Sequence, residues 1–218
     1  MLTTADTGPL FVKYNGIMRG LGCEVPSLQG QMVKLCCSRG TADAFEKRAI
    51  TFEAACERAN KYVTTLHAIN SAVVKLSKLT KVTKVYRGMS GMTLPEQFMK
   101  ANEVGVRGGI ETSFMSTSVD RNVALAYASG DVGLVLEIEQ GMVSRGADIS
   151  FISQYPHEKE VSAQPGTILE NLPSIAARND SREIAETMHA RSSLSQLFDP
   201  VRRSCLRHSL AWRCAPCM

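Results

Sequence analysis

The stretch ISQYPHEKEV, residues 152–161, is the part of the sequence from which the rest of the chain is best interpreted. It places Glu158 and Glu160 two positions apart, so in an extended segment both carboxylates lie on one face, about 7 Å apart. Two such acids repel each other, and each raises the other's pKa unless a cation or a hydroxyl group lies between them. A site that stabilises a positive carbon and also removes a proton from a nucleophile needs such a pair. A solvated, charged loop is the alternative interpretation of this string taken alone.

A second motif, Tyr86-Arg87-Gly88, ends a strand-like segment. The guanidinium of an arginine at a strand end can bind a phosphate or a carboxylate through two N–H groups. The glycine after it would let a ligand approach the backbone closely. Without the other motifs, Arg87 could equally be solvated or paired with a structural partner before a turn.

The third motif is SFMSTS, residues 113–118. In an extended strand Ser116 and Ser118 face one side and Thr117 faces the other. One face could then bind a polar ligand or a carboxylate, while the other could hold the neighbouring strand. Ser118 could instead only cap the helix that follows.

The chain changes from helical to strand-like patterning near Lys81. Residues 10–35 and 41–79 carry apolar residues at helical spacing, which predicts two helices or one broken helix in the second range. Short strands follow at residues 82–86, 112–117, 134–139, 160–163 and 167–169, and a helix runs from Ser118 or Asp120 to about Ala128. This order predicts an α+β domain and not a βαβ repeat. The sequence has no GxGxxG motif and no Walker loop.

Composition sets the broad class of the protein. The chain has 218 residues, 44% of them apolar and 21% charged, and a net charge of +4, so a wholly disordered chain is excluded. No apolar run reaches the roughly 18 residues of a membrane span, and we recognise no signal peptide. Acids are interspersed among the basic residues, so the charge does not predict nucleic-acid binding. We expect reduced thiols at Cys23, Cys36, Cys37 and Cys56, and therefore a cytoplasmic protein.

Residues 173–218 differ in composition from the rest: they contain seven Arg and no Lys. We expect a catalytic domain over residues 1–172 and a poorly ordered tail over 173–218, with one helical candidate at about 181–198. In the tail, Cys205-x-x-His208 and Cys214-x-x-Cys217 have zinc-like spacing, although only five residues separate the pairs. A metal-binding or nucleic-acid-binding role of the tail remains an alternative.

The order and spacing of the three motifs resemble the arginine-specific mono-ADP-ribosyltransferases of the Arg / Ser-Thr-Ser / Glu-x-Glu class. The resemblance extends over roughly residues 9–172, and residues 161–166 are more polar than is usual in that family. It implies an ADP-ribosyltransferase-like fold, in which two small, roughly perpendicular β-sheets form an NAD cleft behind an N-terminal helical layer. It also implies transfer of ADP-ribose from NAD to protein arginine side chains, with release of nicotinamide.

The resemblance implies a role in NAD binding for six residues, one of which is Glu160, which would accept hydrogen bonds from the 2′-hydroxyl of the nicotinamide ribose. Arg87 would contact the NAD phosphates and ribose, and the Gly88 backbone would bind the nicotinamide amide. Ser116 would orient the catalytic glutamate and help to hold the nicotinamide ribose. Thr117 and Ser118 would support the strand and the start of the helix.

The resemblance also implies the roles of the residues around the paired acids. Glu160 would be the catalytic glutamate, which stabilises an oxocarbenium-like ribose, and Glu158 would engage the acceptor guanidinium. Tyr155 would lie on the loop that presents the acceptor. Phe114 and Phe151 could stack on the nicotinamide, but we expect both in the core.

The implied partners are NAD as co-substrate, with NADP as a possibility, and a protein with an exposed arginine. We expect no metal, no membrane and no nucleic acid. A glutamate at 158, where an amide could stand, favours a cationic acceptor, because a guanidinium is a poor nucleophile until it begins to lose a proton. If water replaces the acceptor, the same site is an NAD glycohydrolase. A non-catalytic NAD-binding or interaction module is the other alternative.

Overall fold

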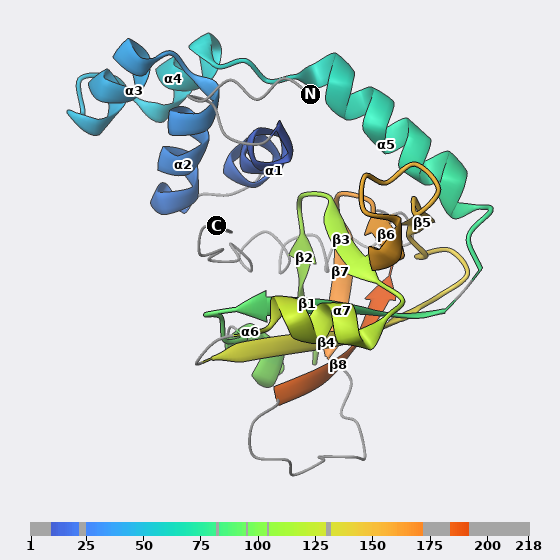
Figure 1. Cartoon of the computed structure of the whole chain (residues 1–218). Helices are drawn as coiled ribbons and strands as arrows, with labels where there is room; N and C mark the ends of the chain where they lie inside the picture. The colour runs from blue at the N-terminus through green and yellow to red at the C-terminus, as the bar shows by residue number, and fades with distance from the viewer. Residues whose placement is uncertain are drawn as a thin grey trace. The chain divides into compact units, whose positions relative to one another are not determined.

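The computed structural model describes residues 10–21, 25–81, 83–94, 96–103, 105–129, 132–171 and 184–191. The chain divides into two compact units, residues 1–69 and residues 70–218. Figure 1 shows helices in the first unit, and strands accompanied by short helices in the part of the second that follows α5 (Val63–Ser77). The predicted boundary at 172/173 lies outside the described residues, and so does the tail apart from residues 184–191.

The helical unit contains α1 (Leu10–Leu21), α2 (Pro26–Cys36), α3 (Arg39–Glu46), α4 (Phe52–Arg58) and the first half of α5. Residues 41–79 are thus helical as predicted, but in three helices, because caps and turns interrupt them. The side chains of Ser38 and Thr51 accept hydrogen bonds from the first turns of α3 and α4. Arg48 and Tyr62 have positive φ angles of 55° and 46°, which no continuous helix accommodates.

The core of the helical unit forms where α1 and α2 meet. Ile17, Met32 and Cys36 are buried there, and Phe52 and Leu66 pack against them. Cys36 is buried, Cys37 and Cys56 are half-buried, and all three are free thiols, as predicted. Cys23 lies outside the described residues.

The strands of the second unit pair in the order β2-β7-β8-β4-β1-β3-β6-β5. Their bounds are β1 (Lys84–Ser90), β2 (Gly108–Glu111), β3 (Met115–Ser118), β4 (Gly133–Gln140), β5 (Ala147–Asp148), β6 (Glu160–Ala163), β7 (Thr167–Asn171) and β8 (Ile184–Arg191). A single pair, Tyr86↔Ser118, joins β1 to β3. The strands therefore form two groups that meet at this pair, and in Figure 1 β4 runs across the view whereas β3 slopes down it toward α7. The predicted α+β class is confirmed.

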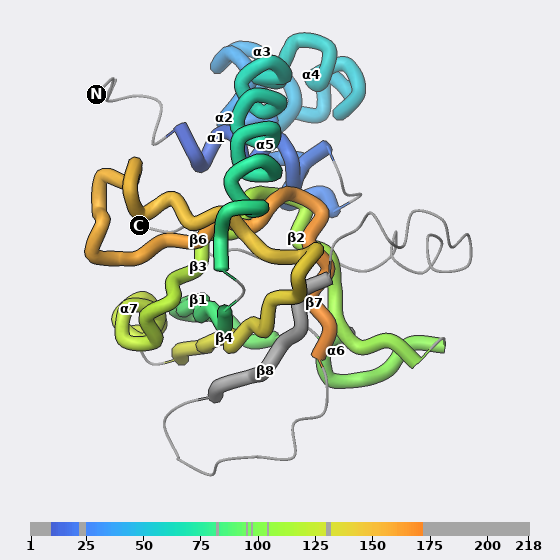
Figure 2. The backbone as a smooth tube through the Cα atoms, turned by 90° about the vertical axis from the view of Figure 1, so that its right-hand side faces the viewer, coloured from blue at the N-terminus to red at the C-terminus, as the bar shows by residue number. Residues whose placement is uncertain are grey.

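Two short helices accompany the strands, α6 (Glu96–Met99) and α7 (Arg121–Tyr127). Figures 1 and 2 both show α7 beside β1. Phe98 of α6 is fully buried, together with core residues of β1 and β4 such as Val85 and Leu136. This core fixes the positions of β1 and β4, and with them the strand that carries Arg87.

The prediction of a helix at residues 181–198 is wrong for residues 184–191, which form β8. This strand pairs in parallel with β4 and antiparallel with β7, and thereby joins them. The error has a physical cause: Ile184 and Met188 are four residues apart, which is one helical turn but also two strand repeats. Free edges on β4 and β7, which no local pattern reveals, decide between the two periods.

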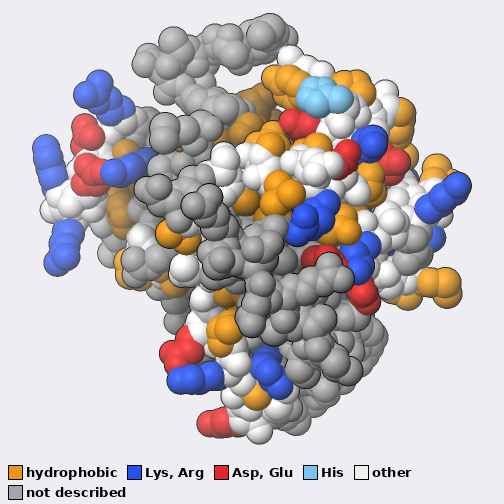
Figure 3. Space-filling view, turned by 60° about the horizontal axis from the view of Figure 1, so that its bottom comes forward, with side chains coloured by type: hydrophobic (Ala, Val, Ile, Leu, Met, Phe, Trp, Pro, Cys, Tyr) orange, Lys and Arg blue, Asp and Glu red, His pale blue; other side chains and the backbone are white. Residues whose placement is uncertain are grey.

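Among the described residues, no helix is both long enough and apolar enough to cross a membrane. Charge on the face drawn in Figure 3 is mixed, with basic side chains beside acidic ones.

Candidate active site

Strands β3 and β6 bring the serine motif and the paired acids together. They are antiparallel, with Ser118 opposite Glu160 and Ser116 opposite Ser162. Directly opposed residues point to the same face of a sheet, with Cβ atoms about 5 Å apart. Ser116, Ser118 and Glu160 therefore lie on one face, although Glu160 follows Ser118 by 42 positions in the sequence.

Arg87 joins this group from β1. Its Nη1 donates a hydrogen bond of 2.6 Å to the backbone oxygen of Ser116. Within the described part of the chain this is its only hydrogen bond to a protein atom, so further N–H donors of the guanidinium can bind an anion. The donor set fits a phosphate of a dinucleotide.

The hydroxyl groups of Thr117 and Ser118 hold the backbone of the acidic segment. Thr117 Oγ1 donates to Val161 O at 2.6 Å, as expected for the residue that faces away from Ser116. Ser118 Oγ donates to Glu158 O at 2.6 Å and accepts from Asp120 N at 2.9 Å. The N-cap of α7 is Asp120, whose side chain accepts from Asn122 N, so Ser118 does not cap the helix.

Glu158 and Glu160 do not share the extended segment that a common face and a spacing of about 7 Å would require. Glu158 ends a short 3-10 helix, η1 (Pro156–Glu158), and Glu160 begins β6. Pro156 stands at the start of that turn, and Lys159 between the two acids has φ 47° and ψ 52°. The left-handed residue reverses the local direction of the chain, so the spacing of an extended strand does not apply. Both acids are half-buried.

Tyr127, at the end of α7, contacts the first acid directly. Its hydroxyl donates to Glu158 Oε1 at 2.8 Å. The pKa of Tyr127 is raised, first by this hydrogen bond, then by burial, and further by the charges of Glu158 and Glu160. At the other end of the helix, Asp120 pairs with Lys159 Nζ at 3.6 Å. The sequence offered only the helical position of Tyr127, and its partner could not be predicted because 31 residues separate the two.

Gly88 serves a structural purpose that we did not predict. A Cβ atom at this position would lie 1.7 Å from the Ala124 oxygen and 3.0 Å from the Ala128 nitrogen of α7. At Gly133 of β4 a Cβ atom would lie 2.1 Å from the Ala128 oxygen. The two glycines let α7 lie directly on the sheet, so the space beside Gly88 that we expected for a ligand is occupied on this side by the helix.

The loop before η1 is exposed. Tyr155 is 53% exposed and Phe151 is 72% exposed, so the expectation that Phe151 lies in the core is wrong. Phe114 is half-buried. The Tyr155 ring packs edge-on against His157, with centroids 6.1 Å apart. The aromatic side chains of this loop are thus available to a partner.

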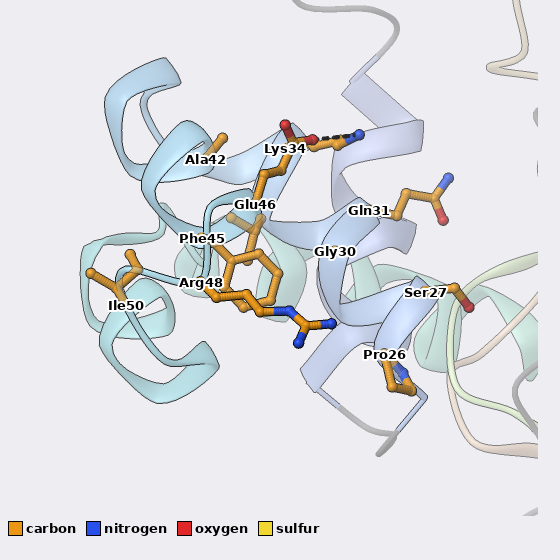
Figure 4. Close-up of a pocket in the computed structure, with 11 residues that line it drawn as sticks. Pro26, Ser27, Gly30, Gln31, Lys34, Ala42, Phe45, Glu46, Arg48 and Ile50 are labelled. Atoms are coloured by element: carbon orange, nitrogen blue, oxygen red, sulfur yellow. Dashed lines mark ion pairs between the residues drawn. The ribbon is translucent and has the colours of Figure 1, made fainter.

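An open pocket of about 620 Å³ lies in the helical unit, lined only by residues between Pro26 and Ile50 (Figure 4). An ion pair of 2.7 Å between Lys34 and Glu46 bridges α2 and α3 at its edge. None of the motif residues lines this pocket.

The metal candidates of the tail, Cys205, His208, Cys214 and Cys217, lie outside the described residues. Among the residues that are described, no three His, Cys, Asp or Glu side chains gather as a metal site would require.

A family model described as ADP-ribosyltransferase exoenzyme matches residues 54–169. The match includes all three motifs and more than half of the sequence. The chain therefore belongs to the ADP-ribosyltransferase exoenzyme family, a family of NAD-dependent transferases. A comparison with curated proteins gives no match.

Several solved structures of ADP-ribosyltransferases are similar to this chain. HopU1 of Pseudomonas syringae is 22% identical, with a TM-score of 0.48; the alignment covers 60% of this chain and 54% of HopU1, so the chain spans about half of that protein. The SpvB domain of Salmonella is 16% identical over 86% of this chain and 96% of the domain, with a TM-score of 0.49. Exoenzyme S of Pseudomonas aeruginosa is 17% identical over 95% of this chain and 94% of its own, with a TM-score of 0.46.

Proposed function

We propose that the chain transfers ADP-ribose from NAD to arginine side chains of proteins and releases nicotinamide. The observation that supports this most strongly is the pairing of Ser118 with Glu160, with Arg87 bonded to the same strand and Glu158 at its end. An anion-binding group, a hydroxyl-bearing strand and two acids thus come from three separate parts of the sequence.

Arg87 and Ser116 would hold the dinucleotide. The guanidinium keeps donors for the phosphates while its bond to the Ser116 oxygen fixes its direction. Ser116 is exposed on the face that carries Glu160, so its hydroxyl can reach the ribose and the carboxylate. Gly88 would contribute only backbone groups, because α7 occupies the space beside its Cα atom.

Glu160 would stabilise the reacting ribose. When the glycosidic bond to nicotinamide breaks, nicotinamide leaves with the bonding electrons as a neutral molecule and positive charge develops on the sugar. A carboxylate fixed at the first residue of β6 stabilises that charge without reorganising.

Glu158 would bind the acceptor guanidinium and remove its proton while a guanidinium nitrogen forms the new bond to the ribose carbon. A carboxylate suits this role, because a guanidinium keeps its proton in water at any ordinary pH. The exposed Tyr155 would contact the acceptor beside it.

The experiment compares wild-type protein with Glu160→Gln and Glu158→Gln, using labelled NAD and agmatine as a small guanidinium acceptor. Glu160→Gln should lower both nicotinamide release and adduct formation by about a hundredfold or more, because the ribose loses its countercharge. Glu158→Gln should lower adduct formation far more than release of free ADP-ribose. Glu103→Gln, at an exposed position, is the matched control and should behave as wild type.

Three outcomes contradict parts of the proposal. Nicotinamide without agmatine adduct would identify an NAD glycohydrolase. If neither nicotinamide nor the adduct forms, the protein is a non-catalytic module. Equal loss of both activities in Glu158→Gln would refute the division of roles between the acids.

A further inference from the structure

Both ends of helix α7 contact the Glu158–Lys159 segment. Tyr127, the last residue of the helix, donates to Glu158 Oε1 at 2.8 Å, and Asp120, its N-cap, lies 3.6 Å from Lys159 Nζ. The ion pair is exposed and contributes little. The hydrogen bond to a carboxylate is the stronger of the two contacts.

The backbone and the side chain of Glu158 are held separately. Ser118 Oγ donates to the Glu158 backbone oxygen at 2.6 Å, which fixes where the residue lies. That bond leaves the torsions of the side chain free, and a glutamate on a surface turn samples many rotamers. The Tyr127 hydroxyl selects those in which Oε1 points toward α7.

This contact leaves the carboxylate able to bind a cation. A carboxylate accepts about four hydrogen bonds, and the phenol uses one on Oε1, so Oε2 remains for a guanidinium N–H. The phenol also stays a donor, since its pKa is raised and it keeps its proton well above neutral pH. Tyr127 is 58% exposed, so its hydroxyl group is not required for packing.

We propose that Tyr127 is a positioning residue, which orients Glu158 toward the acceptor guanidinium and thereby sets the ratio of transfer to hydrolysis. The inference rests on the proposed function. The Tyr127 hydroxyl bonds to Glu158 and not to Glu160, so Tyr127 affects capture of the acceptor more than cleavage of NAD.

The test uses Tyr127→Phe, which removes one oxygen atom and keeps the ring. With labelled NAD and varied agmatine, the ratio of adduct to free ADP-ribose should fall about tenfold or more, through a higher KM for agmatine, as expected for one hydrogen bond to a charged group. Tyr14→Phe removes a phenol oxygen from the helical unit and should keep the wild-type ratio.

A double-mutant cycle shows whether Tyr127 acts through Glu158. Tyr127→Phe in a Glu158→Gln background should lower adduct formation no further than Glu158→Gln alone. An additive loss would overturn the inference, as would an unchanged ratio in Tyr127→Phe or an equal loss of transfer and hydrolysis. If wild-type protein forms no adduct at all, the proposed function itself fails. A wild-type circular dichroism spectrum of each variant shows that its change in activity does not result from unfolding.

Discussion

Replacing Gly88 by alanine tests whether α7 lies directly on β1. The added Cβ atom would lie 1.7 Å from the Ala124 oxygen, where a carbon–oxygen contact needs about 3.2 Å. The helix must therefore retreat by roughly 1.5 Å, because the atoms that the new Cβ meets, Ala124 O and Ala128 N, are backbone atoms and cannot rotate away. Overpacking costs about 1–3 kcal/mol, and we expect the upper end of that range, near 3 kcal/mol.

Thermal and urea unfolding of Gly88→Ala without NAD measure this loss. For a unit of this size, 3 kcal/mol corresponds to a fall in Tm of about 6–12 °C. The matched control is Gly30→Ala, which adds the same methyl group inside α2, where no atom lies within 4 Å of the new Cβ. Since alanine favours helix over glycine, the control should be more stable by about 0.5–1 kcal/mol.

A Gly88→Ala protein as stable as wild type would refute the close seating of α7. Because the measurement needs no ligand, it separates the structural role of Gly88 from any role in binding NAD. Retreat of α7 should also weaken the Tyr127–Glu158 contact. The variant should therefore lose a larger fraction of its transfer activity than of its NAD hydrolysis activity.

Two further predictions concern stability. Thr117→Val removes the buried hydroxyl that donates to Val161 O and should cost about 1 kcal/mol in urea unfolding, whereas Thr83→Val, at an exposed position, should cost almost nothing. Burial raises the pKa of the Cys36 thiol from 9.0 to about 11, so the unfolded chain loses this proton first and the free energy of unfolding should fall as pH rises from 9.0 to about 11. Cys36→Ala should flatten that decline in urea unfolding followed across the same range, and an unaltered slope would contradict the assignment.

The order of helices and strands could be predicted from local patterns. Strand β6 has the predicted bounds, residues 160–163, and α7 ends within one residue of the expected position. Both segments carry their own signals, an alternating run in one and an N-cap with an apolar face in the other. Strand β8 could not be predicted this way, because it forms by pairing with two strands already in place.

In the candidate site, too, local patterns predicted some features and tertiary structure decided others. Arg87, Ser116 and Glu160 are candidate site residues because the order and spacing of three motifs resemble a known family, and their roles stay predictions. The direction of Glu158 did not follow from this spacing, because one left-handed residue, Lys159, turns the chain between the acids.

What the sequence alone determined is the chemistry: which charged and hydroxyl groups the chain has, and in what order they occur. Only the tertiary structure decided their partners, the phenol of Tyr127 on Glu158 and the backbone of α7 against Gly88. The physical reason is that residue type and local period are properties of neighbours in the chain. A hydrogen bond across 31 residues, or a helix seated where a side chain is missing, depends on how separate segments pack.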